Sequence, residues 1–456
     1  MIKVSAEIPS VLAKIVEDKA EQLDRLKQEY PRESLKPQVS ERSLYDSLKA
    51  DPAGFILECK KASPSKGLIR DDFDPQAIAK IYGKYAAGIS VLTDEKYFQG
   101  RFEFLPIVRA EVNQPVLCKD FFIDEFQIDL AAHFGADAIL LMLSVLDDER
   151  YQALAEHAAR YQLDILTEVS NPEELTRAIN LNAKIVGINN RNLRDLSTDL
   201  QRTVELVPSI PKDRVIISES GIYTNDQVRE LAPLVNGFLV GSSIMAQDDL
   251  DQACRQLIFG EVKICGLDRP ESAIAAETAG ALYGGMIFYP KSPRHLSLEA
   301  AKAIRGSANL RFVGVFVNAE VEQMVEYANE LGLFAIQLHG QEDEQTIIKL
   351  KEALPQCQIW QAIAPQEQAS EHADRRLLDV KTQTQPGGSG QTLDWQSEQV
   401  QGQRPAMLAG GLTPENVNQA IAAGFNQLDI NSGVESAKAQ KCSTKIQTVM
   451  RQIRQY

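Results

Sequence analysis

Sixteen short apolar segments recur along this chain of 456 residues at nearly regular intervals, in two sets of eight. Most are continuous in apolar character, which is typical of parallel strands that are covered on both faces. The first set of predicted strands spans residues 55–61, 89–94, 116–121, 138–143, 164–170, 185–190, 215–221 and 237–243. The second set spans residues 262–267, 283–289, 311–317, 335–340, 358–363, 376–380, 406–412 and 427–433.

The segments between these predicted strands have the character of helices. Five glycines are expected to end helices just before the next strand, namely Gly88, Gly135, Gly280, Gly332 and Gly424. A strand–helix order repeated throughout predicts βαβ units and a parallel sheet. In two sets of eight, it predicts an α/β fold of two tandem (β/α)8 TIM barrels, the first with a helical N-terminal extension.

An open, doubly wound sheet is the alternative architecture. Such a sheet would carry a glycine-rich fingerprint after its first strand. Neither half of the chain has one, and residues 63–67 (SPSKG) follow the first predicted strand instead. The pattern therefore favours barrels.

The boundary between the two predicted barrels lies near residues 256–261, where no long linker separates them. We expect a first domain at residues 1–255, with the extension at 1–54, and a second at 256–456. Within the extension, residues 8–28 have apolar positions spaced for an amphipathic helix, among them Leu12, Ile15 and Leu23. That helix either packs on the barrel wall or forms a lid near the active site, and the pattern alone leaves both open.

Composition limits the classes of partner. A net charge of −15 and a pI near 5.0 argue against nucleic acid or an anionic membrane as the main partner. The six cysteines are scattered without a C-x-x-C pair, which fits reduced thiols better than a disulfide frame or a zinc site. The first 28 residues have no signal-like apolar run, and no segment approaches the roughly 20 apolar residues of a membrane span. We expect a cytoplasmic protein that acts on small molecules, with no obligate protein partner.

Polar and ionisable residues end several predicted strands of the first set. They are Glu58, Lys60, Lys119, Glu168, Asn189 and Glu219. Residues two apart on a strand share a face, so Glu58 and Lys60 point the same way. One charge at a strand end is ordinarily just solvated, but strand ends converge in a barrel, and here they would bring two lysines and three carboxylates into one cavity. Opposite charges in a confined site split pKa values and create acid–base partners.

The turns after the last two strands of the first set are rich in small residues. Ser220-Gly221 and Gly241-Ser242 would offer backbone amides where barrels bind phosphate. Lys60 would add a charge to the same phosphate. The alternative is that these are simple turn glycines.

Four segments carry a resemblance to a known family: residues 58–65 (ECKKASPS), 117–121 (LCKDF), 187–193 (GINNRNL) and 218–222 (SESGI). They resemble indole-3-glycerol-phosphate synthase, and the resemblance covers nearly all of residues 1–255. That family closes the indole ring of 1-(2-carboxyphenylamino)-1-deoxyribulose 5-phosphate with loss of carbon dioxide and water. The resemblance implies Lys119 as the leading acid, Glu168 as the partner base, and Lys60 as a substrate-binding group, and it leaves open how Lys60 and Lys119 divide the proton transfers.

The same resemblance implies roles for further residues. Glu58, Asn189 and Glu219 would position and stabilise, and Ser63 would contact substrate. Phe98, Phe121 and Leu193 would form the wall around the anthranilate ring. For Arg191 three roles stay open: it holds its own loop, it holds substrate, or it pairs at the surface.

The second set of strands ends in a different group of side chains. They are Cys265, Gln337, His339, Asp379 and Asp429, with Arg294 in a following loop and the small or polar residues Gly410, Gly411, Asn431 and Ser432. A lone cysteine on a strand is ordinarily core, but Cys265 lies at the catalytic end, opposite a carboxylate from another strand. A thiol that acts as a base needs thiolate character, which a nearby cation supplies. Lys263 is either that cation or half of a structural ion pair, and a satisfied pocket histidine is the favoured interpretation of His339.

Residues 262–266 (VKICG), 292–294 (SPR), 337–340 (QLHG), 377–379 (LLD) and 429–435 (DINSGVE) resemble phosphoribosylanthranilate isomerase, over about residues 256–456. That family performs an Amadori rearrangement of an aminoaldose to an aminoketose. The resemblance implies Asp379 as general acid and Cys265 as general base, an arrangement that needs no metal or organic cofactor. Arg294 would hold the anthranilate carboxylate. Gly411, Asn431 and Ser432 would bind the phosphate, with Asn431 where many family members have serine.

The isomerase product is the synthase substrate, so the two interpretations support each other. The hypothesis is a bifunctional enzyme of tryptophan biosynthesis with the later reaction in the N-terminal half. One rival is another pair of phosphosugar barrel enzymes, because barrels host many chemistries. A second rival is a sugar-phosphate sensor or scaffold, which predicts lost acid–base groups, whereas both halves retain theirs.

Overall fold

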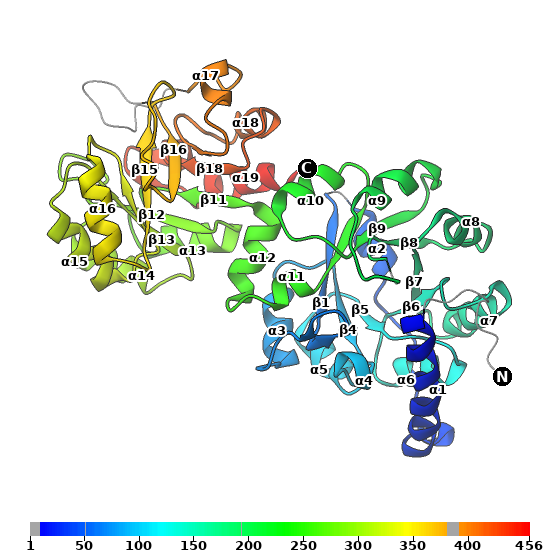
Figure 1. Cartoon of the computed structure of the whole chain (residues 1–456). Helices are drawn as coiled ribbons and strands as arrows, with labels where there is room; N and C mark the ends of the chain where they lie inside the picture. Colours follow the sequence, from blue (N-terminus) through cyan, green and yellow to red (C-terminus); the bar gives the residue numbers. More distant parts are fainter. Residues whose placement is uncertain (1–9, 51, 193, 381–391) are drawn as a thin grey trace. The chain divides into compact units, whose positions relative to one another are not determined.

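The computed structural model of the chain describes residues 10–50, 52–192, 194–380 and 392–456. Contacts divide the chain into two compact units, Met1–Cys254 with Tyr456, and Arg255–Gln455. Each unit contains a closed barrel of eight parallel strands surrounded by helices (Figure 1). The prediction of two tandem (β/α)8 barrels with an N-terminal helix is confirmed. No helix in the described ranges is long and apolar enough to cross a membrane.

The first barrel is formed by strands that pair in the order β1-β10-β9-β8-β7-β6-β5-β4. Their bounds are β1 Gly54–Cys59, β4 Gly88–Leu92, β5 Val116–Lys119, β6 Ala138–Met142, β7 Asp164–Val169, β8 Ile185–Asn189, β9 Val215–Glu219 and β10 Gly237–Val240. A small hairpin of β2 Ala62–Ser63 and β3 Gly67–Leu68 follows β1. The last strand pairs with the first, and Leu57 lies opposite both Val240 and Ile89.

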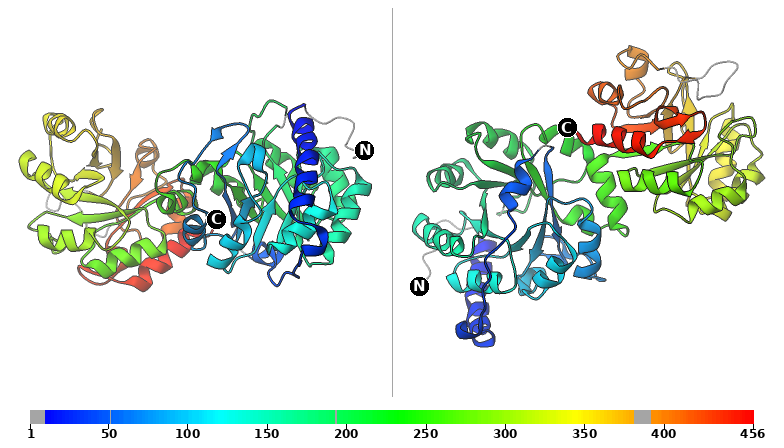
Figure 2. Two further views of the ribbon diagram at one scale, coloured as in Figure 1. Left: turned by 90° about the horizontal axis from the view of Figure 1, so that it is seen from below. Right: turned by 180° about the vertical axis from the view of Figure 1, so that it is seen from behind.

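Helices lie between the strands of this barrel in the chain or after the last one. They are α3 Pro75–Tyr82, α4 Glu95–Phe98, α5 Phe104–Glu111, α6 Glu125–His133, α7 Asp148–Ala159, α8 Pro172–Asn180, α9 Gln201–Leu206, η2 Val207–Ser209, α10 Asn225–Leu231, α11 Ser242–Met245 and α12 Leu250–Phe259. The extension contains α1 Ser10–Glu29, η1 Arg32–Ser34 and α2 Leu44–Lys49. Figure 2 shows α1, in dark blue, as a long helix lying over the first unit.

The second barrel closes in plain chain order, from β11 to β18. Its strands are β11 Glu261–Ile264, β12 Tyr283–Ile287, β13 Arg311–Phe316, β14 Ala335–Leu338, β15 Gln358–Ile363, β16 Arg375–Leu378, β17 Met407–Leu408 and β18 Gln427–Ile430. Its helices are α13 Pro270–Ala279, α14 Leu298–Arg305, α15 Val321–Leu331, α16 Glu344–Ala353, α17 Glu398–Gln401, α18 Val417–Ala422, η3 Ser432–Val434 and α19 Ser443–Arg454. A two-stranded hairpin, β19 Glu435–Ala437 with β20 Gln440–Lys441, follows η3.

Alternation along the strands decides what points into the barrel. On β11, Val262 and Ile264 belong to the main apolar core, which also includes helix residues such as Ile304 of α14. Lys263 between them points the other way, where it meets Gln337 of β14. Successive strand residues face opposite sides of a sheet, so an apolar run with a polar residue at every second position places the polar groups inside the barrel.

Several predicted boundaries are wrong at the C-terminal ends of the strands. The predicted strands include the turns after them, for example as far as Gly221 and Gly433, whereas β9 and β18 end at Glu219 and Ile430. The pairing stops because residues such as Ser220 and Gly221 have positive φ values of 67° and 82°. The polar side chains of the predicted sites therefore lie on the last two residues of a strand or in the turn or loop after it.

Two other expectations also fail. Gly88 does not end a helix, because α3 ends at Tyr82 and Gly88 is the first residue of β4. Residues 364–374, between β15 and β16, contain no helix, although a strand–helix order throughout predicted one. This segment (APQEQASEHAD) lacks the apolar periodicity that packs a helix against a sheet. The chain therefore passes from β15 to β16 through turns.

Candidate active sites

A cavity opens at the C-terminal ends of the first barrel's strands. The predicted residues that line it are Glu58, Lys60, Ser63, Phe98, Lys119, Phe121, Glu168, Asn189, Arg191, Ser220, Gly221, Gly241 and Ser242. Glu219 is buried beside it and contacts Lys119. Leu193 lies outside the described residues. The convergence of strand ends thus brings together nearly all the side chains that the sequence singled out.

Lys119 is at the centre of this cluster. Its Nζ lies 3.1 Å from Oε2 of Glu58 and 3.4 Å from Oε2 of Glu219. Lys60 Nζ lies 2.5 Å from the other oxygen of Glu58. The two lysines therefore share one buried carboxylate between them.

The three glutamates have different pKa values because their surroundings differ. Burial would raise the pKa of Glu58, but Lys119 and Lys60 outweigh it and lower the pKa to about 2. Burial raises the pKa of Glu219 to about 8 despite Lys119, and Glu168 and Glu58 add to the rise. Burial also raises the pKa of Glu168. At neutral pH Glu58 is thus the fixed anion of the cluster, while Glu219 holds a proton.

The ammonium group of Lys119 is strongly held. Burial alone would lower the pKa of Lys119, but Glu58, Glu219 and Glu168 raise it above its ordinary value. Lys119 is therefore charged in the free protein and has a proton to donate.

Asn189 and Arg191 organise the neighbouring loop. Asn189 donates from Nδ2 to Oε1 of Glu168 at 3.0 Å and accepts from the backbone N–H of Arg191 at 2.9 Å. Arg191 donates from Nη1 to the carbonyl of Leu196 at 2.8 Å while it also lines the cavity. The hydrogen bond to Leu196 fits the role in which Arg191 holds its own loop, and a role in binding substrate stays a prediction.

A glycine makes room for the buried Glu219 carboxylate. A Cβ on Gly187, in β8, would lie only 2.0 Å from Oε1 of Glu219. Glycine inside a strand often marks such a close approach. An isolated glycine in the apolar run 185–190 is the sequence signal that could have predicted this packing.

The helix of the extension also reaches this cavity. Leu12 and Ile15 of α1 line it together with Asp94 and Asp120. Lys19 of α1 is almost fully buried, and its Nζ lies 2.7 Å from Oδ2 of Asp94 and 2.6 Å from Oδ1 of Asp120. These two aspartates follow β4 and β5, and Asp120 is adjacent to Lys119. Of the two roles left open for this helix, its residues favour the one at the active site.

Sequence reasoning missed this buried ion cluster. Lys19 lies four residues after Ile15 and four before Leu23, so it falls on the apolar stripe of the helix. A lysine in that stripe signals either snorkelling to solvent or a buried ion pair. The contacts of Lys19 with two aspartates show that it forms a buried ion pair.

The second barrel has a cavity at the corresponding end. All ten predicted residues line it: Cys265, Arg294, Gln337, His339, Asp379, Gly410, Gly411, Asp429, Asn431 and Ser432. Residues 385–390 (QPGGSG), which follow Asp379 in the chain, lie outside the described residues. Tyr289, Lys291 and Lys438 also line the cavity and were not predicted as site residues.

A chain of polar contacts runs across this cavity. Lys263 Nζ donates to Oε1 of Gln337 at 2.7 Å, and Nε2 of Gln337 lies 3.0 Å from Nδ1 of His339. His339 Nε2 lies 3.1 Å from Oδ2 of Asp379. Because the ammonium group orients the Gln337 amide, Nδ1 of His339 accepts a hydrogen bond and the proton resides on Nε2, which donates to Asp379. His339 therefore orients Asp379, consistent with the favoured interpretation of a satisfied pocket histidine.

Cys265 lies at the start of the same chain. Its Sγ is 3.3 Å from Lys263 Nζ, which also contacts Oδ2 of Asp429 at 2.9 Å. Burial raises the pKa of the thiol, and Lys263 opposes that rise. Lys263 thus fills both of its predicted roles, as the cation beside the thiol and as half of a buried ion pair. A Cβ on Gly285 of β12 would lie 2.7 Å from Sγ, so glycine leaves the space that the thiol occupies.

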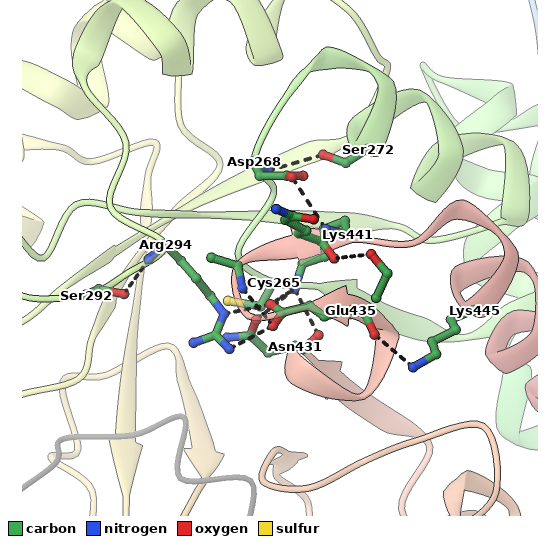
Figure 3. A network of polar contacts seen from close by, with 12 residues as sticks. Cys265, Asp268, Ser272, Ser292, Arg294, Asn431, Glu435, Lys441 and Lys445 are labelled. Carbon is green, nitrogen blue, oxygen red and sulfur yellow. Dashed lines mark hydrogen bonds and ion pairs between the residues drawn. The ribbon is translucent and has the colours of Figure 1, made fainter.

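Arg294 has a partner that the sequence analysis did not foresee. Its Nε and Nη2 donate to the two oxygens of Glu435, at 2.6 and 2.9 Å. Glu435 in turn accepts from Lys441, whose side chain is fully buried (Figure 3). The sequence signal was weak, because both residues lie in the short hairpin that follows the last strand.

The turns after the last two strands have the same backbone in both barrels. Ser220 and Gly221 have φ values of 67° and 82°, and Gly410 and Gly411 have 86° and 64°. After the eighth strands, the residue before the short helix has φ −131° and ψ −76° at Gly241, and φ −122° and ψ −89° at Asn431. A positive φ at a non-glycine residue such as Ser220 is uncommon and is found often at functional sites. Each cavity therefore has one rim built of the same two turns.

Among the described residues, no three His, Cys, Asp or Glu side chains are arranged to hold a metal ion.

Fold and cavities together define a class of protein: a double-barrel enzyme with acid–base groups at the mouth of each barrel. Comparison with known families identifies the two halves. Residues 12–257 match the family described as indole-3-glycerol phosphate synthase, and residues 262–452 match the N-(5′-phosphoribosyl)anthranilate isomerase family. The chain belongs to the bifunctional family that joins these two enzymes of tryptophan biosynthesis, with the synthase in the N-terminal half and the isomerase in the C-terminal half.

Full-length relatives carry the same pair of domains. The chain is 52% identical to the tryptophan biosynthesis protein TrpCF of Vibrio cholerae, over 99% of this chain and 97% of the relative. It is 51% identical to TrpCF of Salmonella typhi, over 98% and 100% of the two chains. It is 48% identical to TrpCF of Haemophilus influenzae, over 97% of each. Family membership over the whole length decides against the two rival interpretations.

Proposed function

We propose that the residues predicted from the sequence carry these two reactions, with residues 256–456 as the isomerase domain and residues 1–255 as the synthase domain. The observation that supports this most strongly is the pair of cavities, each of which gathers an acid and a base from different strands. The isomerase acts first, on phosphoribosylanthranilate.

In the isomerase reaction, Asp379 gives a proton to the furanose ring oxygen as the bond from that oxygen to C1′ breaks. The anthranilate nitrogen supplies the electron pair and forms a Schiff base. Cys265, as a thiolate beside Lys263, then removes the proton from C2′, and the electrons return to nitrogen. The resulting enol takes up a proton at C1′ and loses one from oxygen, which yields the ketone. His339 holds Asp379 in position for the first step.

In the synthase reaction, the ring carbon that bears the carboxylate attacks the C2′ carbonyl. Lys119 donates a proton to that oxygen, and loss of carbon dioxide restores the aromatic ring. Protonation of the C2′ hydroxyl expels water, and Glu168 removes the proton from C1′ to complete the indole. The anionic Glu58 keeps Lys119 charged, Glu219 contacts the Lys119 ammonium group, and Asn189 holds Glu168.

Substrate binding is assigned to the remaining cavity residues. The phosphates bind at the paired turns, at Ser220, Gly221, Gly241 and Ser242 in the first barrel and at Gly410, Gly411, Asn431 and Ser432 in the second. Lys60 and Ser63 reach the same substrate in the first barrel. The rings of Phe98 and Phe121, with centroids 6.2 Å apart, form the wall around the anthranilate ring. Gln337 and Asp429 hold Lys263, and Arg294 receives the substrate carboxylate.

These acid–base roles require no cofactor, and the substrates are small phosphosugar–anthranilate compounds. A cytoplasmic location, without nucleic acid, membrane or an obligate protein partner, is the further part of this proposal. It rests on the acidic composition and the scattered cysteines.

A coupled assay tests the proposal. Freshly made phosphoribosylanthranilate is supplied to the purified full-length protein, and intermediate and product are separated by chromatography. We expect indole-3-glycerol phosphate to appear without any added enzyme. If only the carboxyphenylamino-deoxyribulose phosphate accumulates, the roles assigned in the first barrel are wrong. If nothing turns over but that intermediate, added directly, is converted, the roles in the second barrel are wrong.

A further inference from the structure

The β19–β20 hairpin lies next to the second active site and has no role in the reaction described above. It follows η3 directly, and its Lys438 lines the cavity. Two charged residues of the hairpin, Glu435 and Lys441, are buried, with exposed fractions of 7% and 2%. Buried charges are costly unless they are paired, so their partners indicate what they do.

Both carboxylate oxygens of Glu435 accept hydrogen bonds from donors in different parts of the chain. Oε1 accepts from Nε of Arg294 at 2.6 Å and from Nζ of Lys441 at 2.8 Å. Oε2 accepts from Nη2 of Arg294 at 2.9 Å and from the backbone N–H of Ala439 at 3.1 Å. Arg294 and Lys441 lower the pKa of this carboxyl to about 2, against the effect of burial, which would raise it. Glu435 is therefore a fixed anion, clamped by its own hairpin.

Lys441 connects this anion to the turn after the last strand. Besides Glu435, its Nζ donates to the carbonyl of Asn431 at 2.9 Å and to Oδ1 of Asn431 at 2.8 Å. Figure 3 shows Arg294, Glu435, Lys441 and Asn431 in one continuous network beside Cys265. The hairpin thus joins the arginine of one loop to the turn of another.

The geometry at Arg294 leaves one edge of the guanidinium for a ligand. A guanidinium group presents five N–H donors in a planar fork, and it can hold a carboxylate on each of two edges. Glu435 occupies the edge made by Nε and Nη2. In the part of the chain that the structure describes, Nη1 of Arg294 has no acceptor, and the residue lines the cavity. The edge made by Nη1 and Nη2 is the one that a substrate can use.

We propose that Glu435 is a positioning residue of the isomerase, which fixes the plane of Arg294 so that its outer edge receives the carboxylate of the anthranilate ring. Lys441 balances the charge of Glu435 and ties it to Asn431. The inference rests on the proposed function, in which Arg294 binds that carboxylate. It adds that recognition of the carboxylate depends on a hairpin residue that contacts no substrate.

Paired ligands test this proposal in the full-length protein. Because the isomerase product is also the synthase substrate, their affinity for the second barrel is measured as competitive inhibition of isomerase turnover. One is the stable analogue of the isomerase product in which the C2′ ketone is reduced to an alcohol, and the other is the same compound without the ring carboxylate. We expect Glu435→Gln to weaken binding of the carboxylated analogue by about 10- to 100-fold, because charge-assisted hydrogen bonds to Arg294 are lost. Binding of the analogue without the carboxylate should stay the same. A purely structural role predicts equal losses for both, and that result would overturn the proposal.

A double-mutant cycle gives a second, independent readout. If Glu435 acts through Arg294, then Arg294→Gln with Glu435→Gln should bind the carboxylated analogue no more weakly than Arg294→Gln alone. Additive losses would mean that Glu435 acts elsewhere. If Glu435→Gln does not fold, Glu435→Gln with Lys441→Met removes both buried charges and should show the same selective loss. Both tryptophans, Trp360 and Trp395, lie in the second unit, so their fluorescence reports whether it is folded.

Two controls separate this inference from the function on which it rests. Glu322→Gln, an exposed glutamate of α15, should bind both analogues like the wild type. Turnover of phosphoribosylanthranilate by the wild type is measured first, and its absence would overturn both proposals. Normal turnover by the wild type, with unchanged binding of the carboxylated analogue by Glu435→Gln, would overturn this inference alone.

Discussion

The two barrels share the turns at one rim of the cavity and differ in how they arrange charge at the other. In the first, Lys119 and Lys60 contact the carboxylate of Glu58 directly, and Glu219 contacts Lys119. In the second, Cys265 and Asp379 are separated and are connected through the side chains of Lys263, Gln337 and His339. The two barrels therefore share the same backbone turns at one rim, while the side chains at their other strand ends differ.

The difference matches the two chemistries. Ring closure uses several proton transfers at one carbonyl, and a compact cluster separates the pKa values of its members by mutual contact. The Amadori rearrangement uses an acid at the ring oxygen and a base at C2′, which are different atoms of the sugar. Separate groups, each oriented by its own neighbours, suit that reaction.

The strongest test of independent sites is Lys119→Ala. We expect ring closure to fall by about 10²- to 10⁴-fold, because the donor of the C2′ oxygen proton is lost. The isomerase activity of the same protein should be unchanged. Both activities are measured on one preparation, and loss of both would contradict separate sites.

Asp379→Asn is the converse change. The amide cannot donate a proton as a carboxylic acid does, so isomerase activity should fall by a similar factor of about 10²–10⁴ while ring closure persists. The assay supplies phosphoribosylanthranilate for the first activity and the carboxyphenylamino intermediate for the second. An unimpaired isomerase would remove Asp379 from the acid role.

Lys19→Met tests a feature that only the first barrel has, the docked helix α1. Breaking a buried ion pair by removing one partner costs about 3–5 kcal/mol, so α1 should detach and its amides, from residue 12 to 29, should lose hydrogen-exchange protection. We expect a higher KM for ring closure and an unaltered isomerase.

Arg25→Gln is the matched control for Lys19→Met on the same helix. The Arg25 side chain is 58% exposed and pairs with Glu95 of α4, whose side chain is 39% exposed. Surface ion pairs contribute about 0–1 kcal/mol, so protection of α1 should barely change. Equal effects of the two substitutions would show that the buried cluster has no special role in docking the helix.

Gly285→Ala tests the packing around the thiol in the second barrel. The added Cβ would lie 2.7 Å from Sγ and 2.9 Å from Cα of Cys265. Overpacking of this kind costs about 1–3 kcal/mol, and it should displace the thiol and lower isomerase kcat. Gly306→Ala, where the nearest contact of an added Cβ would be 3.5 Å away, is the control and should leave the activity unchanged.

The last prediction concerns pH and the cluster of the first barrel. Glutamate in an unfolded chain titrates near about 4.3, whereas burial raises the pKa of Glu219 in the folded state to about 8. Between these values the folded state binds the extra proton, so this group makes the folded state less stable as pH rises through that window. Glu219→Gln cannot lose a proton, and its stability relative to the wild type should increase from pH 5 to pH 9.

The buried thiols Cys59 and Cys118 provide the measurement for that comparison. Unfolding in urea exposes them, and pulse labelling at one common pH, quantified at these two residues by peptide mass spectrometry, reports unfolding of the first unit. A stability difference between Glu219→Gln and the wild type that is constant across pH would mean that Glu219 is ionised throughout.

Much of the architecture could be read from the chain itself. Period, length and continuity of the apolar runs predicted both barrels, and the polar residues at their ends predicted which side chains meet. The ends of the strands could not be read in this way, because hydrogen bonding stops where residues such as Ser220 and Gly410 take positive φ values. The helix expected between residues 364 and 374 is also absent. Barrel closure requires only that the chain return to the start of the next strand, and turns can do this as well as a helix.

By itself, the sequence determined the fold, the polar residues that meet in each cavity and the family resemblance, because these depend on local periodicity and on motifs within single strands and turns. Only the tertiary structure decided the partners of Lys19, Arg294 and His339. Each of these contacts joins segments that are far apart in the chain, and no local pattern encodes which carboxylate or amide a long side chain will meet. The same distance explains why Glu435 and Lys441, in a short hairpin after the last strand, become significant only once the barrel has closed around Arg294.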